Sequence, residues 1–76
     1  MKLRLTALSR DEIERIRESG QLTKEQSRLL SLLASDKLTD EGAMRKLSMS
    51  STEYYRIKRE LKLKILRVLL ANALYI

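Results

Sequence analysis

The sequence predicts a small all-α protein of four to five short helices that include a helix-turn-helix. Three observations favour this fold class. Serine or threonine residues able to cap a helix precede four segments of the chain, at Ser9, Thr23, Thr39 and Ser50. Apolar residues within these segments recur at the three- and four-residue spacing of a helix. The chain has 76 residues, enough for one domain that buries only about 60% of its unfolded surface, so dimerisation could help to stabilise it.

Residues 1–8 precede the first predicted helix. Charged and apolar side chains alternate there, with Leu3 and Leu5 on one side, which predicts a short strand. No second strand is evident in the sequence, and a lone strand leaves its backbone groups unpaired. The segment is therefore expected either to pair with its copy in a dimer or to form an extended arm.

The first predicted helix covers residues 10–19. Ser9 and Glu12 fit a capping box, in which each side chain accepts a hydrogen bond from the other residue's backbone amide. Gly20 fits a C-terminal cap in the left-handed conformation, which glycine adopts without steric cost.

The second predicted helix covers residues 24–35 and begins after Thr23. Its central part must be buried, because it carries Leu29, Leu30, Leu32 and Leu33. We interpret it as the scaffold against which the following helices pack.

A helix-turn-helix is predicted within residues 9–76, with its turn at residues 48–50. Thr39 caps the helix before the turn, residues 40–47, and Ser50 opens the helix after it, residues 51–62. In such a motif the second helix lies in the major groove of DNA.

The helix over residues 51–62 has two different faces. At 100° per residue, Tyr54, Ile57, Leu61 and Ile65 fall on one side, which predicts the buried face. The other side begins with small hydroxyls and continues with tyrosine and basic residues, as a base-reading helix requires. The residues predicted to contact bases are Ser51, Thr52, Tyr55, Arg56 and Arg59. Those predicted to bind phosphate are Arg45, Lys46, Lys58 and Lys62.

The net charge of +6 is concentrated in one part of the chain. Residues 1–43 carry equal numbers of basic and acidic side chains, whereas residues 44–76 carry eight basic and two acidic ones. A concentrated basic region is typical of a phosphate-binding surface. Charge alone fits equally well with a solvated face that keeps the protein soluble.

The C-terminal segment is apolar nearly all round. Leu63, Leu66, Leu69 and Leu70 fall where the basic face lies earlier in the helix, so a bend or a new helix is expected near Leu63. We expect a separate helix over residues 64–74 that packs partly on the core and partly on a second copy. The residues predicted for this homodimer interface are Leu66, Leu69, Leu70 and Ala73.

The composition argues against several functional classes. The chain has no cysteine and no histidine, which excludes the usual zinc sites and the Ser-His and Cys-His nucleophile pairs. We therefore expect no catalytic residue, no metal and no cofactor, and a non-enzymatic protein of a reducing cytoplasm. No apolar run approaches the about 20 residues that span a bilayer, so a membrane is not an expected partner.

Two family resemblances agree with the helix-turn-helix. Loosely, Leu22-Thr23, Leu29-Leu30 and Leu47-Ser48-Met49-Ser50 resemble the four-helix DNA-binding domain of LuxR-type regulators and of region four of sigma factors. More closely, Leu47-Ser48-Met49-Ser50 followed by Tyr54-Tyr55-Arg56-Ile57-Lys58 resembles the L-x-M-S-x-x-x-Y-Y-R-x-K signature of ArpU/RinA-type phage transcriptional regulators, over residues 37–74. That resemblance implies control of phage or prophage genes by sequence-specific binding to double-stranded DNA, at the nucleoid of a bacterial cell or infected host.

Two functional hypotheses remain open from the sequence. The favoured one is a DNA-binding transcription regulator. The alternative is an interaction module, such as an adaptor or inhibitor of RNA polymerase, that uses the apolar segment from Leu63 to Ile76. Surface binding to a membrane through residues 58–76 is a third, weaker hypothesis.

Overall fold

The computed structural model describes residues 8–74, and these are all-α, as the sequence predicts. The elements are α1 (Arg10–Ser19), α2 (Lys24–Leu30), the π-helical turn η2 (Ser31–Ser35) that continues α2, α3 (Asp40–Leu47) and α4 (Ser51–Leu74). No strand occurs within this range. The predicted N-terminal strand or arm lies almost entirely in residues 1–7, outside the described residues.

The predicted helix starts are confirmed by their capping contacts. The Ser9 hydroxyl accepts a hydrogen bond from the Glu12 amide, and Glu12 accepts one from the Ser9 amide. The Thr39 hydroxyl likewise accepts from the Gly42 amide at 3.1 Å. At the start of α4, the Ser50 hydroxyl accepts from the Glu53 amide at 3.3 Å. These bonds satisfy amide groups that a helix leaves free in its first turn.

Gly20 ends α1 in a different way from the prediction. Its φ is −80°, so the predicted left-handed cap is wrong, and the positive φ falls on Gln21 instead. The Gly20 amide donates a hydrogen bond to the Ile16 carbonyl oxygen at 2.7 Å. A β-carbon at Gly20 would lie 2.5 Å from that same oxygen, so the close approach requires glycine.

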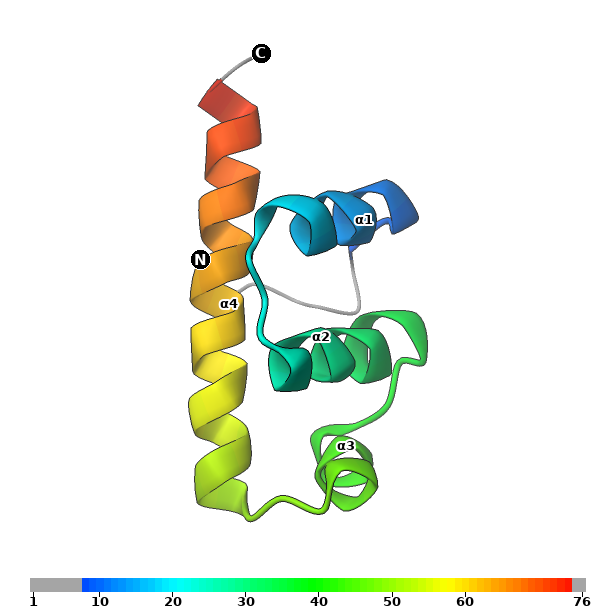
Figure 1. Cartoon of the computed structure of the whole chain (residues 1–76). Coiled ribbons are helices and arrows are strands. Elements are labelled where there is room, and N and C mark those ends of the chain that lie inside the picture. The colour runs from blue at the N-terminus through cyan, green and yellow to red at the C-terminus, as the bar shows by residue number, and fades with distance from the viewer. Residues whose placement is uncertain (1–7, 75–76) are drawn as a thin grey trace.

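Figure 1 shows α4 as a long spine, with the other helices stacked along one side of it. In that view, α1 lies beside the C-terminal half of α4, α2 beside its middle, and α3 beside its N-terminal end. The core lies between α4 and the shorter helices. Its buried residues are Ile13, Ile16, Leu29, Leu30, Leu33, Ala34, Ala43, Tyr54, Ile57, Leu61, Ile65 and Val68.

α4 runs without interruption, so the break expected near Leu63 is wrong. Its buried positions continue at helical spacing past that point, through Leu61, Ile65 and Val68. A single straight stripe thus packs on the core from Tyr54 to Val68. Of the leucines that suggested a break, Leu63, Leu66 and Leu70 lie on the outward side of the same helix, whereas Leu69 packs partly against the core. The segment predicted to read bases and the apolar C-terminal segment therefore belong to one continuous helix.

The middle of α4 is fixed to α2 by a polar contact. Gln26 is buried, and its Oε1 accepts hydrogen bonds from the Lys64 ammonium at 2.8 Å and from the Thr23 amide at 3.1 Å. The Lys64 ammonium also donates to the Gln21 carbonyl oxygen at 2.9 Å. These bonds set the position of α4 along α2, and thereby the position of its N-terminal half.

Candidate nucleic-acid interface

The connection between α3 and α4 is short and tightly bonded. Ser48 adopts the left-handed conformation, with φ 53° and ψ 44°, and ends α3. The next amide, that of Met49, donates to the Met44 carbonyl oxygen at 3.1 Å. Met49 is partly buried against the core, as the apolar plug of such a turn should be. α4 then begins at Ser51, and α3 lies beside the N-terminal end of α4 in Figure 1.

Asp40 joins the start of α3 to the first two turns of α4. Its Oδ1 accepts a hydrogen bond from the Tyr54 hydroxyl at 2.6 Å and forms an ion pair with the Lys58 ammonium at 2.7 Å. Partial burial would raise the pKa of Asp40, but these two bonds and the charges of Lys58 and Lys62 outweigh it and hold that pKa below its ordinary value. Burial and the bond to the Asp40 carboxylate raise the pKa of Tyr54.

The residues predicted to read bases share one exposed surface. Ser51, Thr52, Tyr55, Arg56 and Arg59 are all exposed on α4. Tyr54 is fully buried, as predicted, whereas its neighbour Tyr55 is 48% exposed. The two rings meet edge to face, with their centroids 5.1 Å apart, so the buried ring supports the exposed one. The side of α4 turned away from the core is therefore polar and basic over residues 51–62.

The residues predicted to bind phosphate fall into two groups. Arg45 and Lys46 are exposed at the end of α3, and Lys62 is partly exposed on α4. Lys58 differs, because its side chain is only 19% exposed and its ammonium is paired with Asp40. We therefore assign Lys58 to the contact between α3 and α4, and its binding to phosphate stays a prediction.

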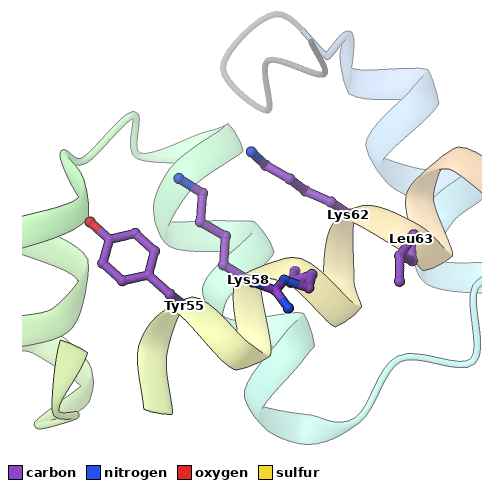
Figure 2. A pocket seen from close by; sticks show the side chains of 5 residues that line it. Tyr55, Lys58, Lys62 and Leu63 are labelled. Carbon is purple, nitrogen blue, oxygen red and sulfur yellow. The ribbon is translucent and has the colours of Figure 1, made fainter. Parts of the chain in front are cut away.

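A depression in this surface lies along α4. Tyr55, Lys58, Arg59, Lys62 and Leu63 line it. Figure 2 shows Tyr55, Lys58 and Lys62 projecting toward one side of the helix, whereas the Leu63 side chain points away from them. The Lys58 ammonium lies 6.0 Å from the centre of the Tyr55 ring, at the outer limit of a cation–π contact. The depression thus combines one aromatic ring with three basic side chains, of which Lys58 is paired with Asp40.

The outward side of α4 becomes apolar after Lys62. Leu63 is 56% and Leu70 61% exposed, and Leu66 between them is partly exposed. Leu69, predicted to lie in a dimer interface, packs partly against the protein's own core. The side chain of Ala73 lies outside the described part of the structure. We call Leu63, Leu66 and Leu70 the outer leucine stripe.

Arrangements typical of other classes of site are not found in the described range. Residues 8–74 contain no group of three His, Cys, Asp or Glu side chains placed to hold a metal ion. Within the same range, no helix combines the length and the apolar character that a bilayer crossing needs. Comparison of the chain with protein-family models, with curated proteins and with solved structures finds no match.

Two residues of this region could not be assigned a role from the sequence. Asp40 fits an acidic residue in a helix's first turn, and Gln26 fits the third position of a capping box. Their contacts with Lys58 and Lys64 join residues 18 and 38 positions apart in the chain. For Asp40, the only indication in the sequence was that an acidic residue on one helix could pair with a lysine on the strongly basic helix that follows.

Proposed function

We propose that this chain is a sequence-specific double-stranded DNA-binding transcriptional regulator, in which α3, residues 48–50 and α4 act as a helix-turn-helix. One observation carries the proposal. All five polar or basic residues expected to read bases are exposed together on α4, while the apolar residues interleaved with them are buried. A helix that offers such a surface just after a tight turn suits the major groove.

The order of side chains along α4 fits insertion by its N-terminal end. Ser51 and Thr52 are short, so the first turn can approach base edges closely. Arg56 and Arg59 follow on the exposed side, and arginine can donate two hydrogen bonds to guanine O6 and N7. Residues 51–59 extend about 12 Å at 1.5 Å per residue, which is comparable to the width of the groove.

Cations at the edges of this surface suit the DNA backbone. Arg45 and Lys46 lie at the C-terminal end of α3, and Lys62 lies one turn beyond Arg59 on α4. They would fix the position and direction of α4 on the duplex without reading sequence. The ArpU/RinA-type signature adds phage or prophage genes as the proposed targets, with RNA polymerase as a further candidate partner.

We also propose that two copies pair through the outer leucine stripe. Leu63, Leu66 and Leu70 follow each other at intervals of three and four residues, the spacing of a helix–helix seam. Helix-turn-helix dimers bind two half-sites, so pairing would double the surface that contacts DNA. The stripe also carries the second candidate function, an adaptor that binds the transcription machinery, because the same leucines could receive another protein's helix.

A binding titration tests the proposal. Fluorescence anisotropy of a labelled random duplex should report binding that weakens as salt is raised, because Lys and Arg release counterions from phosphate. Sequences selected from a random pool should then bind more tightly than the starting pool at equal salt. Absence of salt-dependent binding to any duplex would remove the regulator proposal and leave the adaptor.

A further inference from the structure

We propose that Asp40 limits the affinity of this surface for DNA of any sequence by holding Lys58 as an internally neutralised cation. The inference rests on the proposed function and deepens it, because it assigns a regulating residue to the same surface. Asp40 would act as an intramolecular competitor: its carboxylate occupies the ammonium group that a phosphate would otherwise contact.

The contacts place Asp40 and Lys58 in competition with a phosphate. Lys58 lines the same depression as Tyr55, Arg59 and Lys62, so its stem lies on the surface that faces the ligand. Its ammonium turns to Asp40 Oδ1, 2.7 Å away, instead of to solvent. The Asp40 side chain is itself held in place, because the same oxygen accepts a 2.6 Å hydrogen bond from the Tyr54 hydroxyl. The pair is therefore preorganised by a buried residue and does not depend on two flexible side chains finding each other.

The exposure of the pair makes the competition reversible. The Asp40 side chain is 37% exposed and that of Lys58 19% exposed, so neither charge is sealed from water. Exposed and partly exposed pairs contribute little to stability, so removal of the Asp40 charge should free Lys58 without unfolding the protein. Asp40 also places a negative charge near Lys62, whose own charge contributes to the low pKa of Asp40. Loss of the carboxylate would make the Lys58 ammonium available to phosphate beside Lys62.

The size of the effect follows from counterion release. Each additional phosphate contact steepens the slope of log affinity against log salt by about 0.9 for duplex DNA. Extrapolated from 1 M to 0.1 M salt, one more contact corresponds to about an eightfold gain in affinity. The Asp40→Asn variant keeps the shape of the side chain and an oxygen that can accept the Tyr54 bond, but removes the charge.

The test compares Asp40→Asn with two matched controls on a random duplex. Glu41→Gln makes the same change in net charge at the next, exposed position of α3. Tyr54→Phe removes the other hydrogen bond to Asp40 but leaves the pair with Lys58. We expect Asp40→Asn to steepen the salt slope by about one and to tighten binding several-fold at 0.1 M salt. Both controls should stay near the wild-type slope.

The Lys58→Gln variant, alone and combined with Asp40→Asn, completes a double-mutant cycle on the salt slope. In the wild-type background it should change the salt slope little, because Lys58 is already neutralised. In the Asp40→Asn background it should return the slope to the wild-type value. A Lys58→Gln change that flattens the wild-type slope by one, or an Asp40→Asn variant that matches Glu41→Gln, would overturn the proposal.

Heparin chromatography separates this inference from the proposed function. If the wild-type protein binds no duplex, the regulator proposal fails, but the same variants can still be compared on an immobilised polyanion. Asp40→Asn should then elute at higher salt than Glu41→Gln. Co-elution of the two variants would contradict the role of Asp40, whatever the natural ligand is.

Discussion

The Tyr54 hydroxyl donates a 2.6 Å hydrogen bond to Asp40 Oδ1, which joins a fully buried ring on α4 to the first residue of α3. Asp40 lies at the opposite end of α3 from residues 48–50, which connect α3 to α4. α3 and α4 are thus tied at two places, by the chain and by this bond. The second tie holds the start of α3 against the first turn of α4.

Tyr54→Phe should lower the free energy of unfolding by about 1–3 kcal/mol, because a bond to a charged acceptor is lost from a buried site. Urea denaturation followed by circular dichroism gives the value. Tyr55→Phe is the control, since the Tyr55 ring is exposed, and it should change stability by less than about 0.5 kcal/mol. Equal losses in the two variants would mean that the Tyr54–Asp40 bond contributes nothing specific.

Stability should fall in acid partly through Asp40. Its pKa in the folded protein is below its ordinary value of about 3.9. The ionised carboxylate therefore stabilises the fold above about pH 4, and that contribution disappears as the pH falls through the lowered pKa. Unfolding measured from pH 7 to pH 2 should show wild type and Asp40→Asn converging in stability at the acid end. A constant difference across the range would rule out the ionised carboxylate as the source.

Leu70→Glu should abolish self-association without unfolding the protein. Leu70 is 61% exposed on the outer leucine stripe, so a charge there costs the folded monomer little but would be buried in a paired helix. Sedimentation velocity over a range of concentrations gives the association state. Glu53→Gln, at the other end of α4, serves as the control and should leave association unchanged. A wild-type protein that stays monomeric, with and without DNA, would contradict the pairing and favour another partner for the stripe.

Arg56→Ala and Lys62→Ala should affect DNA binding in different ways. Loss of a base-reading arginine should cost about 1–3 kcal/mol on a selected sequence and relax the preference at that position. Loss of a phosphate-binding lysine should weaken all duplexes alike and reduce the salt slope by about one. Anisotropy titrations on selected and random duplexes separate the two effects. Equal losses on both duplexes for Arg56→Ala would remove it from the base-reading residues.

Local signals in the sequence were sufficient for the helices around the connection. The capping residues Ser9 and Thr39 predicted the starts of α1 and α3, and both helices have the predicted bounds. Capping works through bonds within four residues, so neighbouring sequence determines it. The sequence predicted η2 only as the end of the second helix. In the structure it is π-helical, because the Asp36 amide donates to the Ser31 carbonyl oxygen, five residues back, where an α-helical amide donates four residues back.

Features that depend on packing between helices could not be predicted in the same way. The leucines at positions 63, 66, 69 and 70 suggested that α4 breaks, although Ile65 and Val68 keep the core stripe in register. The C-terminal half of α4 has one apolar face toward the core and a second apolar face toward the outside. In a sequence, two such faces hide the helical spacing of the apolar residues. The pairing of Lys58 with Asp40 was also missed, because it depends on how α3 lies beside the start of α4 and not on neighbouring residues.

A nuclear magnetic resonance titration tests the central claim most directly. A ¹⁵N-labelled chain is mixed with a duplex selected for tight binding, and the shift of each backbone amide signal is followed. We predict the largest changes at residues 51–59 of α4, smaller ones at Arg45, Lys46 and Lys62, and little change on α1. Changes centred on α1 or on the outer leucine stripe, with residues 51–59 unmoved, would contradict the account.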